Sequence, residues 1–141
     1  MFTWLINFNI YNPVVRCKMI ERPLINVILK NENLKKKYLK YLKDVTIIAS
    51  SGGKTSDGKT YEKDNLNNII NKYGDDLINK SGKSSYSFYT EEEIKTAQTN
   101  IKEIINLRSE AVNNQIDKNN RVVKASFDIS SLGSQNIENN G

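Results

Sequence analysis

Histidine is absent from the 141 residues of this chain, and cysteine occurs once, at Cys17. Without histidine the chain lacks the commonest general base and the commonest metal ligand of proteins. A single cysteine forms no internal disulfide and no thiolate metal cluster, and without histidine it forms no Cys–His nucleophile pair. The sequence therefore excludes catalytic and zinc sites built on these residues, and we expect Cys17 to be a half-buried or free thiol.

Long hydrophobic runs are also missing. No stretch reaches the roughly 18 apolar residues that cross a bilayer, so we predict no membrane span. The first 15 residues are apolar but have no positively charged start and no small-residue cleavage site, which makes them a poor signal peptide. Their aromatic and β-branched residues predict an extended or strand-like segment over residues 1–21. Its Phe2, Trp4 and Phe8 would be exposed if nothing covered them.

The charge balance is basic, because 21 lysines and arginines face 16 aspartates and glutamates, for a formal net charge of +5. The lysines are spread along the chain. The densest run, Lys35–Lys37, lies among leucines and tyrosines, as on the solvated side of an amphipathic helix. No motif of a nucleic-acid reader accompanies the charge, so we do not expect nucleic-acid binding. Apolar residues make up 38%, enough for one modest core.

Four segments carry apolar side chains at helical spacing, which predicts a mainly α-helical fold of four amphipathic helices. Pro23 suits the first turn of a helix over residues 23–30, where its missing N–H costs nothing. The residues of this helix expected to be buried are Leu24, Ile25, Ile28 and Leu29. Asn31 or Asn33 is expected to cap a second helix. The expected apolar face of that helix is Leu34, Tyr38, Leu42 and Val45.

A third helix is predicted over residues 65–79, with Asp64 as its N-cap. Gly74 weakens this helix by about 1 kcal/mol relative to alanine. Its apolar face is Leu66, Ile69, Ile70, Tyr73, Leu77 and Ile78. The glycine- and serine-rich stretches on either side, residues 49–63 and 80–88, are predicted to be exposed loops.

The start of the fourth helix is the clearest local signal in the chain. Thr90–Glu93 has the pattern of a capping box, and Tyr89 and Ile94 occupy the two positions of a hydrophobic staple. The helix is predicted over residues 91–116, about 39 Å long at about 1.5 Å per residue. Its apolar stripe is Ile94, Ala97, Ile101, Ile104, Ile105, Val112 and Ile116. Arg108, on or near this stripe, is expected either to pair with a buried acid or to extend its charged end to solvent.

The helical region is expected to end near Asp117, so that residues 1–117 form one domain. Residues 118–141 are rich in serine, asparagine and glycine and are predicted to be a flexible, disordered tail or linker. Within them, Val122–Ile129 could pair as a short strand.

Gly53–Thr60 matches the P-loop pattern G-x-x-x-x-G-K-[ST] letter for letter. In a P-loop the glycines let backbone amides surround phosphates, the lysine reaches the terminal phosphates, and the Ser/Thr hydroxyl binds Mg²⁺. Such a loop enters an apolar helix that packs on a parallel sheet. Here polar residues 61–65 follow the motif and no series of β–α–β units is visible, so a surface loop is the favoured interpretation. Nucleotide binding through Gly53–Thr60 is the weaker alternative.

Two carboxylate clusters, Asp75–Asp76 and Glu91–Glu93, have no partner base or metal ligand near them in the sequence. The first is expected to lie on a helix surface, and the second to stabilise the start of a helix through its dipole. Neither cluster is assigned a catalytic or metal-binding role.

Several short segments of the sequence are each too loose to indicate a family, but their order and spacing are more specific. They are Arg22–Ile25, Tyr38–Leu42, the helix Leu66–Ile78, Phe88–Glu93, and a final helix with Arg108 and Gln115–Ile116. In this order and spacing, over about residues 12–117, they resemble the C-terminal helical part of the CotH kinase family, the spore-coat-type atypical protein kinases.

The resemblance implies a kinase-like fold with ATP and a divalent metal as cofactors, protein serine as acceptor, and a secreted, cell-surface or spore-coat location. The family's ATP-binding lysine and metal-binding aspartates lie upstream of the segment that Arg22–Ile25 resembles. No aspartate precedes Asp44 here, so no catalytic, cofactor-binding or metal-binding residue is carried over. We therefore expect a C-terminal fragment, inactive alone, whose partner is the missing N-terminal kinase lobe. A stand-alone helical protein-interaction module is the alternative.

Overall fold

The structure, a computed structural model, describes residues 6–13, 21–82, 89–119 and 121–124. In this part of the chain the fold is mainly α-helical, as predicted. The helices are α2 (Pro23–Lys30), α3 (Glu32–Thr46), α4 (Asn65–Leu77) and α5 (Glu91–Ile116). Two π-helical turns, η2 (Ile47–Ser51) and η3 (Ile78–Gly82), continue α3 and α4, and strands β1 (Gly53–Lys54) and β2 (Thr60–Tyr61) form an antiparallel hairpin.

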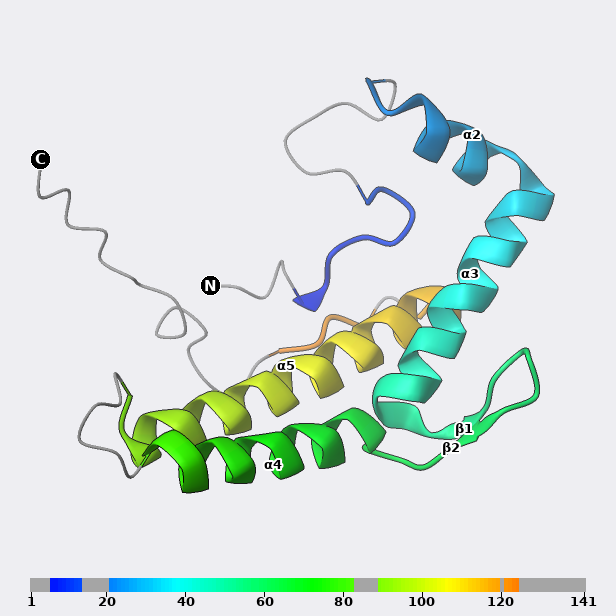
Figure 1. The fold of residues 1–141 in the computed structure, drawn as a ribbon. Coiled ribbons are helices and arrows are strands. Elements are labelled where there is room, and N and C mark those ends of the chain that lie inside the picture. The colour runs from blue at the N-terminus through cyan, green and yellow to red at the C-terminus, as the bar shows by residue number, and fades with distance from the viewer. Residues whose placement is uncertain (1–5, 14–20, 83–88, 120, 125–141) are drawn as a thin grey trace, which may run out of the picture.

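The long helix α5 supports the rest of the molecule (Figure 1). α4 runs alongside its N-terminal part in the opposite direction, and α3 packs on its C-terminal part. Lys43 Nζ and Thr46 Oγ1 of α3 both donate to Asn113 Oδ1 of α5, at 2.9 and 3.1 Å. α2 turns away at the far end of α3, and the hairpin projects from the junction of α3 and α4 (Figure 1). The helices that pack along α5 are therefore α3 and α4.

Side-chain caps set the starts of two helices where the sequence predicts them. Asn31 Oδ1 accepts from the amides of Asn33 and Leu34, both at 3.1 Å, and so caps α3. At α5, Thr90 Oγ1 accepts from the Glu93 amide at 3.2 Å, and Glu93 Oε2 accepts from the Thr90 amide at 2.7 Å. The capping box and the bounds of α5 are confirmed. Of the two positions of the predicted staple, Ile94 is buried and Tyr89 is 61% exposed.

α4 begins at Asn65, as predicted, but its cap and its end differ from the prediction. Asp64 adopts a left-handed conformation with φ +58° and makes no side-chain cap for α4, so its expected role as N-cap is wrong. Its amide donates to the Ser50 carbonyl at 2.8 Å, which ties the start of α4 to η2. At the other end regular helix stops at Leu77, and Ile78 belongs to η3. A tertiary contact therefore replaces the local cap.

The core brings together three distant parts of the chain. Ile6, Ala111 and Val123 are 1–4% exposed and form one cluster, against which Ile104 and Leu107 pack. Residues 6–13 contain turns and no strand, so the predicted extended conformation is wrong for this stretch. These residues lie against α5, which supplies the cover that their apolar side chains needed.

Val123 lies in the segment that the sequence predicts to be a disordered tail. The side chain of Asn7 holds Val123 in place through two hydrogen bonds. Asn7 Nδ2 donates to the Val123 carbonyl at 2.7 Å, and the Val123 backbone amide donates to Asn7 Oδ1 at 2.9 Å. The packed region thus extends beyond the boundary expected at Asp117. Residues 121–124 form no strand. The rest of the predicted tail, residues 125–141, lies outside the described residues, as do Phe2, Trp4, Cys17 and Phe88.

Several apolar side chains expected to be buried face solvent instead. In α2 no residue is fully buried, and Leu24 is 73% exposed. The residues of the predicted α3 and α4 faces that are exposed are Leu34, Val45, Ile69, Tyr73 and Leu77. Ala97 and Ile101 of the predicted α5 stripe are exposed as well. The predicted faces are therefore only partly right, because helical periodicity does not indicate how wide a strip a neighbour covers.

Two glycines allow close approaches that the sequence does not indicate. Gly74 of α4 is buried, and a Cβ there would lie 1.6 Å from the Gln98 amide nitrogen. This Gln98 side chain crosses α4 and donates to the Ile70 carbonyl at 3.3 Å. Gly52, with φ +67°, ends η2, and a Cβ there would lie 2.6 Å from the Lys63 amide nitrogen. Residues 49–63 are thus a π-turn and a hairpin rather than an irregular loop.

Candidate functional site

The P-loop-like motif Gly53–Thr60 forms the β1–β2 hairpin. Gly53 pairs with Tyr61, and Lys54 pairs with Thr60. A P-loop instead joins a parallel strand directly to a helix. Here the lysine and threonine of the motif lie in or beside β2, and α4 begins only at Asn65. The hairpin therefore does not have the backbone arrangement of a phosphate-binding P-loop.

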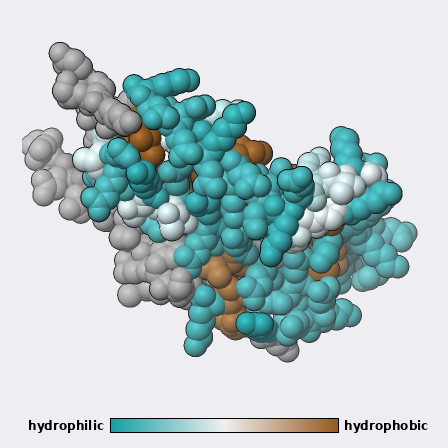
Figure 2. Space-filling model, turned by 90° about the horizontal axis from the view of Figure 1, so that it is seen from below, coloured by the Kyte–Doolittle hydropathy of each residue, from teal (hydrophilic) through white to brown (hydrophobic). Residues whose placement is uncertain are grey.

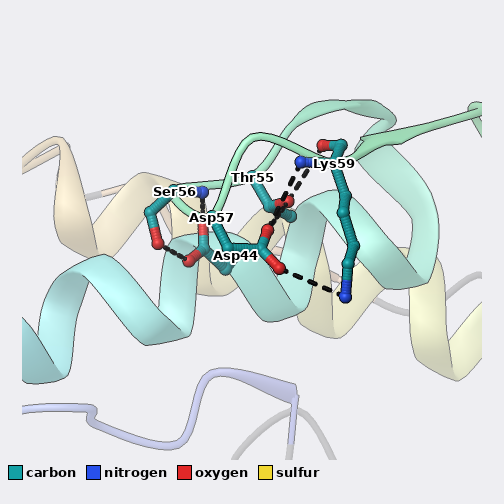
Figure 3. Close-up of polar contacts among 5 residues, drawn as sticks. All are labelled: Asp44, Thr55, Ser56, Asp57 and Lys59. Carbon is teal, nitrogen blue, oxygen red and sulfur yellow. Dashed lines mark hydrogen bonds and ion pairs between the residues drawn. The ribbon is translucent and has the colours of Figure 1, made fainter.

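The polar groups of this hairpin are engaged with carboxylates (Figure 3). Ser56 donates to Asp44 of α3 through its amide, at 2.8 Å, and through its hydroxyl. The Thr55 hydroxyl donates to Asp57 Oδ1 at 2.6 Å, and Lys59 Nζ lies 3.3 Å from Asp57 Oδ2. The donors that would have to face a phosphate thus face aspartates.

The hairpin carries one acid, Asp57, beside the two lysines Lys54 and Lys59. The hydrogen bond from the Thr55 hydroxyl, with a weaker one from the Lys59 amide, lowers the pKa of the Asp57 carboxyl. Asp57 is therefore negatively charged at neutral pH, and it pairs with Lys59, the cation that would have to meet a phosphate. These contacts stabilise the hairpin itself. They agree with the interpretation of the motif as a surface loop.

The two carboxylate clusters serve the helices that carry them. Asp75 and Asp76 are exposed on α4. In the first turn of α5, Glu91 pairs with Lys95 and Glu93 belongs to the capping box. Among the described residues no group of three or more Asp, Glu, His or Cys side chains lies close enough together to hold a metal ion.

Arg108 anchors the N-terminal segment, a role that the sequence did not suggest. Its Nη1 donates to the carbonyls of Ile6 and Phe8, both at 2.8 Å. The expectation that it pairs with a buried acid or extends to solvent is therefore wrong. Partial burial lowers the pKa of Arg108. Burial also raises the pKa of the neighbouring Tyr38 phenol, whose hydroxyl donates to the Ile10 carbonyl at 2.8 Å.

Gln115 continues this anchor along α5. Its side-chain oxygen accepts from the Ile10 amide at 2.8 Å, and its side-chain nitrogen donates to the Phe8 carbonyl at 3.2 Å. The Tyr11 hydroxyl donates to the Gln115 carbonyl at 3.2 Å. Polar groups of α5 thus satisfy the backbone of a segment that has no regular secondary structure.

No family model, curated protein or solved structure matches this chain. The resemblance to CotH kinases therefore stays a prediction. Within the described residues, no helix combines the length and the apolar character that crossing a bilayer requires.

The described residues enclose a cleft of about 660 Å³. It lies between the N-terminal half of α3, the segment 7–11, and the end of α5 with the residues that follow it. Its charged residues are Glu32, Lys35, Lys36, Lys118 and Arg121. We name it the basic cleft, because four cationic side chains face one acid.

Sequence reasoning singled out Lys35–Lys37 only as a solvated helix side and missed the other parts of the basic cleft. Tyr11, Lys118 and Arg121 carry no local pattern that would have marked them. The cleft joins segments about 100 positions apart, as in the pair Ile10 and Gln115. A pattern within a short window cannot reveal such a site.

Proposed function

We propose that this chain is a helical protein-binding region and that the surface it binds is the catalytic lobe of a CotH-like kinase. The observation that supports this proposal is the number of large apolar side chains on α2, α3 and α4 that are exposed to solvent. Exposed apolar residues that gather on one surface are typical of protein interaction sites. Separate hydrophobic patches are also visible between hydrophilic residues in Figure 2.

Two stripes of exposed apolar residues have the spacing of a helix face. The α3 stripe is Tyr41 and Val45 of α3 with Ile48 of the η2 turn that continues it, and the α4 stripe is Ile69, Tyr73 and Leu77. Tyr41 and Tyr73 are each about two-thirds exposed, at 64% and 66%. Tyrosines combine a large apolar body with a polar tip and are enriched at protein interfaces. Both stripes have the chemistry of a helix face that packs on another protein.

Support for the kinase partner comes from the residues that carry the resemblance. Arg108 and Gln115 act on the backbone of residues 6–10. Tyr38 reaches the same segment from α3. These roles are structural, as expected for a helical region that supports catalysis carried out elsewhere. Phosphate transfer then depends on the partner lobe, which in the family supplies ATP and metal binding.

The test uses the polypeptide encoded immediately upstream of this chain. We expect it to carry the acidic metal motif of the family, and to form a 1:1 complex with this chain, measured by size-exclusion chromatography with light scattering. Tyr73→Lys should weaken the complex at least tenfold without lowering the melting temperature, because Tyr73 is exposed. Lys72→Gln, at the adjacent exposed position, is the matched control. An upstream polypeptide without the acidic motif, or without binding, contradicts the kinase partner.

A stand-alone interaction module is the second candidate, and the core favours it. Ile6, Ala111 and Val123 close a cluster within this chain. A region with its own core can fold alone and meet its partner afterwards. If the purified chain is a folded monomer that binds a protein other than a kinase lobe, and Tyr73→Lys abolishes that binding, this second function replaces the first.

A further inference from the structure

We propose that the basic cleft binds a small organic oxyanion, a molecule that carries a phosphate or carboxylate group on an apolar body. This site is separate from the α3 and α4 stripes, and the inference does not depend on the proposed function. It rests on three properties of the cleft: its charge, the apolar part of its lining and the contacts among its lining residues.

The charge of the cleft is unbalanced. Lys35 lies 3.7 Å from Glu32, and Arg121 lies 3.9 Å from Glu110, so each of these two cations has an acid nearby. Lys36 and Lys118 form no ion pair with any described residue. Lysine and arginine side chains donate to phosphate and carboxylate oxygens, and arginine can do so with two parallel hydrogen bonds. An anion in the cleft would supply the missing negative charge.

Part of the lining of the cleft is apolar and aromatic. Leu39, Ile116 and Val122 line it together with Tyr11. Val122 is 60% exposed although its neighbour Val123 is buried. A bare inorganic ion would leave this surface in water, whereas an organic body would cover it. A volume of about 660 Å³ lies within the range of small-molecule sites, which is about 300–1,000 Å³.

The walls are held by contacts within the protein. Lys35 Nζ lies 5.7 Å from the centre of the Tyr11 ring, which is within the range of a cation–π contact. Tyr11 is fixed to α5 through the Gln115 carbonyl. Lys118 adopts φ +56° just past the end of α5, and its amide donates to the same carbonyl at 3.2 Å. Cations on fixed backbone lose less freedom when an anion binds.

The position of Lys118 offers a variant that keeps the fold. A residue in the left-handed conformation after a helix is normally glycine, so Lys118→Gly removes a cleft cation and should leave the melting temperature equal or higher. Lys36→Gln removes the other cation that has no ion pair. Lys37→Gln is the matched control, because Lys37 lies on the same helix but does not line the cleft.

The experiment is calorimetric titration of the full chain at low salt with phenyl phosphate, benzoate, inorganic phosphate and benzyl alcohol. We expect phenyl phosphate or benzoate to bind at least tenfold more tightly than inorganic phosphate or benzyl alcohol. The stronger of the two organic anions identifies the head group. Lys118→Gly and Lys36→Gln should each weaken this binding about fivefold, the effect of one unit charge about 4 Å away in water. Higher salt should weaken it further.

Two results would overturn the inference. The first is that neither organic anion binds more tightly than inorganic phosphate, which would leave only nonspecific attraction to surface lysines. The second is that Lys37→Gln weakens binding as much as Lys36→Gln and Lys118→Gly do, which would place the anion outside the cleft. Melting temperatures of all variants, measured alongside, show that any loss of binding is not a loss of folding.

Discussion

Single side chains of α5 organise the N-terminal segment. Residues 7–13 form no helix or strand, so the buried carbonyls of the N-terminal segment need donors from elsewhere in the protein. Arg108 satisfies two of them, those of Ile6 and Phe8. A charged donor makes stronger hydrogen bonds than a neutral one. One arginine therefore holds a segment that lies about 100 positions away in sequence.

Removal of this arginine should destabilise the whole fold. Arg108→Met keeps most of the side-chain volume but leaves the Ile6 carbonyl without its donor and the Phe8 carbonyl with only the Gln115 amide. We expect this to lower the free energy of unfolding by about 2 kcal/mol. Urea unfolding followed by circular dichroism measures it. Arg121→Met, at an exposed arginine, is the control and should change stability by less than about 0.5 kcal/mol. Equal effects of the two variants would contradict the anchoring role.

At the scale of elements, some helices begin at a local side-chain cap, and another begins at a tertiary contact. α3 and α5 begin at side-chain caps that can be read from the sequence. α4 begins at Asp64 in a left-handed conformation, with its amide bonded to η2 instead of its side chain bonded to α4. Helices with their own caps can start independently, whereas α4 depends on the packing of η2.

The capping box of α5 should make stability depend on pH. The hydrogen bond from the Thr90 amide, followed by that from the Thr90 hydroxyl, lowers the pKa of the Glu93 carboxyl. A lowered pKa in the folded state means that ionised Glu93 stabilises the fold. This contribution is present above the unfolded value of about 4.3 and is lost as the pH falls through the lower folded value.

Glu93→Gln is the corresponding variant, because glutamine keeps an oxygen for the cap but carries no charge. We expect it to melt at a lower temperature than the parent chain at pH 7, and the difference to shrink as the pH falls to about 3. Thermal unfolding at both pH values measures this. Glu92→Gln removes an equal charge outside the capping box. If it showed the same pH-dependent difference, the helix dipole alone would explain the effect.

At the scale of the whole molecule, the two ends of the described chain meet in one core. Ile6 and Val123 pack together against Ala111 of α5. The domain therefore needs residues beyond Asp117, which composition alone assigned to a tail. Meanwhile the outer faces of α2, α3 and α4 remain apolar and exposed. The same chain thus closes its core at α5 and leaves apolar surface on its other helices exposed.

Adjacent valines test this closure. Val123→Ala should lower the free energy of unfolding by roughly 2 kcal/mol, since two buried methylene equivalents are lost and a small cavity remains. Val122→Ala, at the exposed neighbour, should change it by less than about 0.5 kcal/mol. Chemical unfolding of both variants decides between them. Similar small effects of both would mean that residues 121–124 do not belong to the core.

The sequence predicted the positions of the helices well, but it predicted poorly which of their side chains are buried by other elements. The bounds of α2 and α5 and the caps at Asn31 and Thr90 agree with the prediction, because they depend on residues within one or two turns. Leu24 and Tyr73 were expected to be buried and are exposed. Periodicity shows that a helix has an apolar face but not whether another element of the same chain covers it.

By itself, the sequence determined that this is a mainly helical protein without histidine chemistry, and where most of its helices begin. These properties follow from composition and from contacts a few residues apart. Only the tertiary structure decided that Gly53–Thr60 is a hairpin with its donors turned to Asp44 and Asp57, and that Lys36 and Lys118 share a cleft. Such features depend on contacts between segments up to about 100 residues apart, which no local pattern encodes.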